Sequence, residues 1–518
     1  MRRLALLLAG ACLWADNYPR QAAIDVEHYA FRLELSDLTD EIQGEARVDI
    51  RSAGARELVL DFASVMSVDG VTSGPTGLAF IHQANRLRIA LPPGGERRSV
   101  TIRYHGKPAA GLRTGPNQHG ERTFFSLNWP DLARQWLPMI DHPYDKATSE
   151  FSVIAPAHYQ VAANGLLQEQ LDLPGGRRMT HWKQGVPISS WLNAIAVARF
   201  SVRHLGLSQG IELSNWVYPQ DRAKGIATFD APTRHAVEFF SGFVGPYPYE
   251  KLANVQAAGF SGGTEHASVI FYGEKAVTEK GATNLVIHEI AHQWFGNSVT
   301  EADWNDVWLS EGFATYFTLL CLEHVEGRDA FVSGLKRSRA AVIGLTANLP
   351  DAPVIHSNLT DMKKVLNRLI YEKGAWTLHM LRRRIGMDAF RAGVREYYAR
   401  YKGGNATTAD FQRVMEHHGG TELGWYFDQW LRRANLPVLD GTWRYDAAAK
   451  QVRVSLRQTQ AGPAYRLAVE IGLDGGRLER VELKDRQGEF TFPVDREPEG
   501  VRLDPETWLL AETTFKKQ

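Results

Sequence analysis

The chain of 518 residues has only two cysteines, Cys12 and Cys321. A mature chain that begins after Ala15 retains one of them and therefore cannot form an internal disulfide. Cys321 lies in the apolar helical pattern FTLLCLEHV. That setting predicts a buried, small hydrophobic side chain rather than a nucleophile.

An excess of charge of either sign is also missing, as are internal repeats and low-complexity tracts. The 59 Lys and Arg residues balance the 59 Asp and Glu residues, so no overall field attracts nucleic acid or an anionic membrane. We therefore expect no nucleic-acid partner. The length exceeds what one core supports and suggests roughly two to four domains.

No transmembrane segment is expected in the mature chain. The N-terminal stretch MRRLALLLAGACLWA has two arginines and an apolar run that ends at Ala15. This run is too short to span a bilayer but is typical of a secretory signal. We expect residues 1–15 to be removed and the protein to be exported, to the periplasm or the cell exterior. An N-terminal helix of a cytoplasmic protein and a lipoprotein anchored through Cys12 are the alternatives.

The hydrophobic pattern changes twice along the chain. From about Ile24 to Leu205, short alternating runs such as YAFRLEL and SVTIRYHG are separated by Pro-Gly turns, which predicts an all-β region. From near Pro232 to Arg433 the apolar spacing of three and four predicts a mostly helical region. Alternation then returns. The expected fold is multidomain α+β, with a signal peptide at 1–15, a β domain at 16–205, a mostly helical domain at 206–435 and a small β-sandwich at 436–518.

The helical region contains the segment VIHEIAHQWFGN, with His288, Glu289 and His292. Positions i and i+4 share one helix face, so the two imidazoles can converge on one metal ion. Glu289 lies close enough to reach a metal-bound water. Gly296 and Asn297 predict the end of this helix.

A third metal ligand follows in WNDVWLSEGFATY, where eighteen residues separate His292 from Glu311. We expect Ser310 to cap a new helix and to place Glu311 in its first turn. Two imidazoles and one carboxylate leave a tetrahedral zinc ion with one open position for water. The first segment alone is only suggestive, and a solvated histidine pair on a helix face is its alternative. The sequence thus predicts one zinc ion per chain.

At this point the chain resembles the gluzincin zinc aminopeptidases, the family of aminopeptidase N. The resemblance rests on both metal segments and on GPYPYEKL, IYEKGAWTLHML, YFDQWLRRANLP and RQWLPMIDHPYDKATSEF. It implies that the helical domain is thermolysin-like. It also implies a short form that lacks the C-terminal helical domain of larger relatives and therefore has a more open site.

The resemblance also assigns roles in catalysis. Zinc lowers the pKa of its bound water to ~7, and Glu289 takes the proton and passes it to the leaving amine. Tyr371 matches the catalytic tyrosine of the family and would stabilise the oxyanion; the alternative is a core aromatic residue. Asp303 and Asp306 either orient the zinc histidines or serve as caps.

The loop GGTEH resembles the G-x-M-E-N segment of the family. By that resemblance Glu265 binds the free α-ammonium of the substrate, and the backbone of Gly262 and Gly263 lies along the peptide. Thr264 and His266 depart from the family residues. His266 either adds positive charge near the amine or replaces a hydrogen bond.

Trp129 stands where the family commonly has a glutamine of the amine site. Either the amine is held differently here, or Trp129 lines the first subsite.

The expected function is a zinc aminopeptidase that acts on peptides with a free N-terminal amine. A thermolysin-like endopeptidase is the nearest alternative, and it requires that Glu265 bind no amine. A catalytically silent peptide-binding protein is a third hypothesis, but such a protein has no chemical need for Glu289 and Tyr371.

Overall fold

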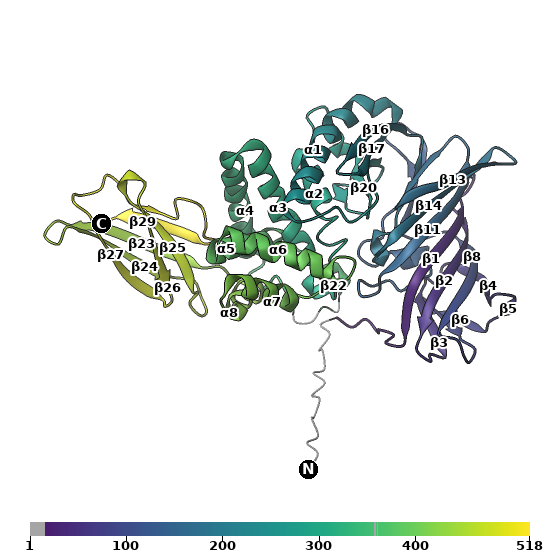
Figure 1. Cartoon of the computed structure of the whole chain (residues 1–518), viewed down its shortest axis with the longest axis horizontal. Helices are drawn as coiled ribbons and strands as arrows, with labels where there is room; N and C mark the ends of the chain where they lie inside the picture. Colours follow the sequence, from purple (N-terminus) through teal and green to yellow (C-terminus); the bar gives the residue numbers. More distant parts are fainter. Residues whose placement is uncertain (1–15, 357–358, 360) are drawn as a thin grey trace, which may run out of the picture.

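The computed structural model describes residues 16–356, 359 and 361–518. The predicted signal sequence and Cys12 lie outside the described residues. Figure 1 shows three parts in a row: the N-terminal strands, a helical middle part and the C-terminal strands. None of the described helices is both long and apolar enough to span a bilayer.

Alternating apolar residues fold the N-terminal part into β-sheets, as the sequence predicts. The largest sheet has eight strands in the order β13-β14-β11-β1-β2-β8-β4-β5. Its centre is β1, which pairs antiparallel with β2 and parallel with β11. The strands are β1 (Ile24–Glu34), β2 (Ile42–Ser52), β4 (Ser67–Ser73), β5 (Thr76–Gly77), β8 (Arg97–Gly106), β11 (Ala147–Pro156), β13 (Leu166–Leu173) and β14 (Arg177–Ile188).

Two smaller sheets complete the N-terminal part. One has four strands in the order β12-β15-β10-β9, and the other has three in the order β3-β7-β6. Their strands are β3 (Glu57–Asp61), β6 (Phe80–Gln83), β7 (Arg86–Ala90), β9 (Leu112–Pro116), β10 (Arg122–Ser126), β12 (Gln160–Ala163) and β15 (Ile195–Ala198).

A five-stranded sheet begins the middle part, in the order β16-β17-β18-β20-β19. Its first strand crosses the predicted domain boundary after residue 205. The edge strand β19 consists of Gly263 and Thr264 of the GGTEH loop and pairs antiparallel with β20. The strands are β16 (Ser201–Ser208), β17 (Ile211–Val217), β18 (Lys251–Ala257), β19 (Gly263–Thr264) and β20 (Val269–Gly273).

The helices of the middle part begin at Arg222, earlier than the pattern predicts, because Pro232 lies inside the first helix. They are α1 (Arg222–Phe243), α2 (Thr283–Ala291), α3 (Trp308–Glu326), α4 (Arg328–Asn348), α5 (Arg368–Ile385), α6 (Met387–Tyr401), α7 (Thr408–Gly419) and α8 (Gly424–Phe427). A short parallel pair, β21 (Thr300–Glu301) and β22 (Asn405–Ala406), joins two of the loops.

Helices α3 and α5 cross at a pair of glycines. A Cβ on Gly312 would lie 3.0 Å from the Cα of Gly374, so neither position has room for a larger side chain. The close approach brings Glu311 of α3 beside Tyr371 of α5. Cys321 is buried on α3, and burial raises the pKa of its thiol to about 12. The prediction that Cys321 is a buried residue of the core is confirmed.

The C-terminal part has two sheets, as expected of a small sandwich. Their orders are β27-β24-β23-β29 and β26-β25-β28. The buried side chains of these strands join those of the helices in one continuous core. The strands are β23 (Val438–Asp446), β24 (Gln451–Gln458), β25 (Leu467–Gly472), β26 (Leu478–Leu483), β27 (Gln487–Pro493), β28 (Arg502–Leu503) and β29 (Glu512–Lys517).

Buried lysine ammonium groups link the three parts. Lys146 and Lys251 join the N-terminal strands to the middle part, and Lys373 joins α5 to the start of the C-terminal strands. Lys146 donates to the carbonyls of Asn297, Ser298 and Gly404, Lys251 to Ala163 and Ser268, and Lys373 to Arg433, Ala434 and Asn435. Each ammonium group has three donors to satisfy, which suits it to fixing a chain junction.

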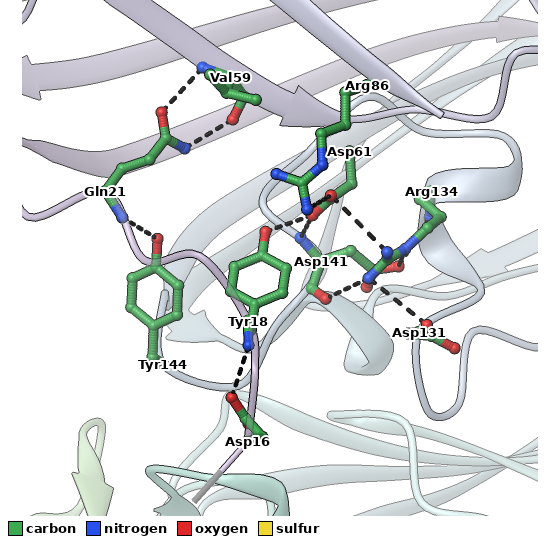
Figure 2. Close-up of polar contacts among 10 residues, drawn as sticks. All are labelled: Asp16, Tyr18, Gln21, Val59, Asp61, Arg86, Asp131, Arg134, Asp141 and Tyr144. Carbon is green, nitrogen blue, oxygen red and sulfur yellow. Dashed lines mark hydrogen bonds and ion pairs between the residues drawn. The ribbon is translucent and has the colours of Figure 1, made fainter. Parts of the chain in front are cut away.

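The first described residues run along the N-terminal sheets (Figure 2). The Gln21 amide pairs with both backbone groups of Val59, at 2.7 and 2.9 Å, and the Tyr18 hydroxyl donates to Asp61. Asp61 also forms ion pairs with Arg86 and Arg134.

The segment then reaches the loop that precedes α3. The Asp16 carboxylate bonds the His142 ring at 2.7 Å, and the Asp16 amide donates to the Asp303 carboxylate at 3.4 Å. Arg20 pairs with the same Asp303 oxygen at 3.5 Å. This segment therefore connects the N-terminal sheets to the chain that presents Glu311.

Candidate active site

His288, His292 and Glu311 converge on one point. The two Nε2 atoms lie 3.2 Å apart, and Glu311 Oε2 lies 3.4 Å from His288 and 3.2 Å from His292. No described cation bonds this carboxylate oxygen apart from the two imidazoles. The spacing suits three ligands of a single ion.

The two histidines lie one helical turn apart at the end of α2. The helix proper stops at Ala291, and His292 donates its amide to the His288 carbonyl at 3.3 Å. The helix therefore ends before Gly296, which was the predicted stop.

Ser310 does not cap its helix, contrary to the prediction. Helix α3 begins at Trp308, with Val307 at the N-cap, and Glu311 lies in the first turn as expected. The Ser310 hydroxyl lies 3.1 Å from His292 Nδ1, and the Phe295 carbonyl lies at the same distance. These contacts orient the ring with Nε2 toward the other ligands, which is the usual role of groups behind a metal-binding histidine.

Carboxylates dominate the electrostatics of the site. Burial acts to lower the pKa of His292, but Glu311, Glu265 and Glu289 offset this and raise it to about 10. Burial acts to raise the pKa of Glu311, yet His292 and His288 hold it well below its ordinary value. A cluster of three carboxylates around two imidazoles attracts a dication, and the N and O donors suit zinc. The residues therefore fit the predicted ion.

The carboxyl group of Glu289 lies against the GGTEH loop. A Cβ on Gly263 would lie 2.3 Å from the Glu289 carboxyl carbon, so only glycine allows this contact. Glu289 is 5% exposed. Burial raises its pKa well above the ordinary value, Glu265 and Glu311 raise it further, and His292 opposes them.

Two buried amide side chains hold the loop in place, and the sequence analysis missed both roles. The Glu265 carbonyl accepts hydrogen bonds from Gln293 Nε2 at 3.0 Å and from Asn297 Nδ2 at 2.5 Å. The Gln293 carbonyl oxygen accepts from the Ser268 amide at 2.8 Å. Both amides follow His292 within a few residues, in the segment HQWFGN, and that position was the one available signal.

Tyr371 lies beside the metal ligands. Its hydroxyl donates to Glu311 Oε1 at 2.9 Å, and its ring stacks on His288 with centroids 6.1 Å apart. Burial, followed by Glu311, raises the pKa of this phenol well above its ordinary value. The hydroxyl is thus a protonated donor.

His266 faces the core instead of an open pocket. It is fully buried and packs edge-on against Phe271, with centroids 4.6 Å apart. Burial lowers its pKa to about 3, so the ring is neutral and brings no positive charge to the loop.

Trp129 lies between the N-terminal strands and the loop before α3. Its ring packs edge-on against Trp191 at 5.5 Å and Trp304 at 4.6 Å between centroids. Asp303 caps the short turn that contains Trp304, because its carboxylate accepts from the Asn305 amide at 3.1 Å. The Asp306 carboxylate accepts from the Thr408 hydroxyl at 2.6 Å at the start of α7.

A cleft of about 560 Å³ lies beside the metal site. His288 and Tyr371 line it where it meets the ligands, and Leu285 and Leu319 contribute apolar surface. Arg337 of α4 and Arg368 at the start of α5 also line it. The cleft can accommodate a peptide segment next to the reacting centre.

Two family models match the chain. The model of the peptidase M1 N-terminal domain matches residues 25–192, and the model of the peptidase family M1 domain matches residues 229–430. Together they span most of the two regions that form the site.

Curated relatives include aminopeptidases. A glutamyl aminopeptidase of Bitis rhinoceros is 30% identical over 325 residues, which are 60% of this chain and 34% of that protein. The glutamyl aminopeptidase of Rattus norvegicus is 28% identical over 397 residues, 72% of this chain and 42% of that protein. The chain thus spans about a third to two fifths of the length of these relatives.

A solved structure shares the fold. The M1 zinc metallopeptidase from Deinococcus radiodurans superposes with a TM-score of 0.69 at 25% identity, covering 80% of this chain and 95% of the other. The two family models and this structural match agree with the metal site, and the chain belongs to peptidase family M1.

Proposed function

We propose that this protein is a zinc-dependent aminopeptidase that releases the N-terminal residue of peptides. One observation carries the proposal: Gln293 and Asn297 hold the backbone carbonyl of Glu265, and the Glu265 carboxylate lies near enough to raise the pKa of both Glu289 and His292. A carboxylate fixed at this place can pair with an α-ammonium and so position the first peptide bond at the reacting centre.

His288, His292 and Glu311 would hold the zinc ion. When bound, zinc supplies a Lewis acid that polarises the peptide carbonyl and makes water a nucleophile near neutral pH. We propose one ion per chain. A second group of donors, Glu396, His417 and His418, lies at the surface, where Arg400 also pairs with the carboxylate.

Glu289 moves the proton in this proposal. Its carboxylate takes a proton from the attacking water and later gives it to the leaving nitrogen, so that the acid and base steps balance. The contact with Gly263 supports this role, because it fixes the carboxylate beside the backbone along which the peptide would lie.

Tyr371 stabilises the negative charge that develops on the carbonyl oxygen. Its phenol keeps its proton in the buried site, and it already donates to Glu311 at 2.9 Å. A donor placed beforehand in a site with little water acts most strongly on a charge that forms only in the transition state.

The cleft beside His288 and Tyr371 receives the residues after the scissile bond. Glu265 can pair with the α-ammonium of a short peptide, and Arg337 of the cleft can pair with the peptide's carboxylate; Arg368 also lines the cleft but already lies 3.8 Å from Glu372. We further propose that the protein is exported, on the basis of the arginines and apolar run in residues 1–15.

Two paired measurements test the proposal. The wild type should cleave aminoacyl fluorogenic substrates that have free amines, and a chelator should abolish this activity. It should not cleave the N-acetylated forms of the same substrates. Glu289→Gln should retain zinc and lose turnover. Equal cleavage of acetylated substrates would identify an endopeptidase, and full turnover by Glu289→Gln would overturn the mechanism.

A further inference from the structure

A second cavity, of about 410 Å³, lies between the helical middle part and the C-terminal strands. Its residues come from the last turn of α5, from α7 and α8 with the loop between them, from η7 (Asp428–Arg432), from β25 and β26 and from the chain before β29. None of them belongs to the metal site. Four arginines line the cavity, Arg383, Arg384, Arg466 and Arg480, together with one carboxylate, Glu470.

Two of these guanidinium groups lie over the same indole. The central carbons of Arg384 and Arg466 are each 4.5 Å from the ring centroid of Trp425. Both also approach one oxygen of Glu482, at 3.7 and 2.6 Å. Burial and then Arg466 lower the pKa of Arg384, so the two cations repel each other and share a single counterion.

The other two guanidinium groups also share one carboxylate oxygen. Arg383 and Arg480 both pair with Oε1 of the buried Glu470, the latter at 3.3 Å. Burial and then Arg480 lower the pKa of Arg383, while Glu506 acts in the opposite sense. Lys484 adds a further positive charge beside Glu482 at 3.6 Å.

The helix dipole explains only part of this cluster. Arg383 and Arg384 stand in the last turn of α5, where cations are favourable. Arg466 and Arg480 come from the C-terminal part, so the dipole gives no reason for them to converge on the same place. Arg384 Nε is buried and has no hydrogen-bond partner among the described residues. The cavity is thus lined by more cations than carboxylates, although Oε2 of Glu470 is also buried without a hydrogen-bond partner among the described residues.

The geometry points to a binding site for an organic dianion, a phosphate monoester or a compound of like charge, between α5 and the C-terminal strands. Guanidinium groups form paired hydrogen bonds to such oxyanions. The apolar lining of the cavity by Met380, Trp430, Leu467 and Leu509 provides a surface for the organic part. The cavity exceeds the volume of one bound water by far, since a water occupies about 30 Å³ in the liquid.

Calorimetric titration of the intact, zinc-loaded protein tests this site. Phenyl phosphate is the probe, and phenol and benzoate are the neutral and singly charged comparisons, all at constant ionic strength. Phenyl phosphate should bind with one saturable site per chain that depends on the arginines, inorganic phosphate should compete with it, benzoate should bind more weakly and phenol should not bind. The double variant Arg384→Gln, Arg466→Gln should bind at least about tenfold more weakly.

The controls separate this site from the metal site and from misfolding. Arg457→Gln removes an exposed arginine of the same C-terminal part and should bind as the wild type does. Phosphate bound at the zinc ion would survive in the double variant, and so unchanged binding there overturns the proposal. If the double variant does not fold, Arg480→Gln tests it instead, because that side chain is 67% exposed. Wild-type affinity in Arg480→Gln, or no saturable binding by the wild type, contradicts the proposal.

Discussion

The carboxyl group of Glu289 occupies the space that a side chain on Gly263 would need. A Cβ atom on Gly263 would lie only 2.3 Å from the carboxyl carbon of Glu289. The glutamate of the zinc helix and the loop that carries Glu265 are therefore built against each other. A change in either one moves the other.

Gly263→Ala should lower kcat/KM on the order of 100-fold, because a displacement of about 1 Å at a catalytic group has that effect. The variant should still fold and bind zinc, since the clash involves only the side chain of Glu289 and none of the proposed metal ligands. Gly344→Ala is the matched control, because nothing lies within 4 Å of a Cβ there. Activity of Gly263→Ala near that of the control would mean that the contact does not position Glu289.

Gln293→Ala should loosen the loop without touching a metal ligand. The Glu265 carbonyl loses one of its two amide donors, and the Ser268 amide loses its acceptor. Removing a buried hydrogen bond costs about 1–3 kcal/mol, so KM for free-amine substrates should rise roughly tenfold or more. Steady-state kinetics measure this, and a change confined to kcat would argue against a role in holding the substrate end.

Tyr371→Phe should retain the fold and the zinc ion but lower kcat by about 100- to 1,000-fold, as expected for loss of a donor to the oxyanion. KM should change little, because the hydroxyl acts mainly in the transition state. Metal analysis and kinetics on the same preparation check both statements. A purely structural role would instead appear as a lower melting temperature with unchanged kcat.

Asp145 makes stability depend on pH. Burial raises the pKa of this carboxyl from 3.8 to about 8, and Asp25 adds to the effect. The unfolded chain releases the proton near pH 4, whereas the folded chain keeps it until about pH 8. The stabilising contribution is therefore complete below pH 4 and is lost as the pH rises to 8, at up to about 1.4 kcal/mol per pH unit.

Asp145→Asn removes this dependence, because the amide does not ionise. Relative to the wild type, the variant should gain stability between pH 5 and pH 8, as measured by thermal unfolding at each pH. Asp351→Asn, at an exposed position, is the control and should follow the wild type. A constant difference between Asp145→Asn and the wild type would show that Asp145 ionises normally in the folded chain.

Local patterns predict the metal site and the fold class well. The spacing of His288 and His292 places both rings on one helix face, and the motif around Glu311 supplies the carboxylate that the structure brings beside them. Period-two alternation likewise identifies the two β regions. These features depend on neighbours in the sequence, which is why sequence alone reveals them.

Other features depend on packing between distant segments. The sequence predicts Ser310 to be a helix cap, but the helix starts at Trp308. The Ser310 hydroxyl instead lies within hydrogen-bonding distance of the His292 ring. His266 looks like a site residue until its burial against Phe271 is seen.

Long-range contacts explain the remaining differences. The hydrogen bond from Gln293 to the Glu265 carbonyl joins residues that are 28 positions apart in the sequence. No local sequence pattern predicts it. The lysine contacts between the parts are of the same kind, since each depends on backbone carbonyls that carry no sequence signal.

Glu265 is proposed to restrict cleavage to peptides with a free N-terminal amine, and the substitution Glu265→Gln checks this role. Matched peptides with free and N-acetylated termini are compared in the wild type and the variant, with zinc content measured in both. The wild type should strongly prefer free amines, and the variant should lose most of this preference while it keeps its zinc. An undiminished preference in the zinc-loaded variant would show that Glu265 does not bind the substrate amine.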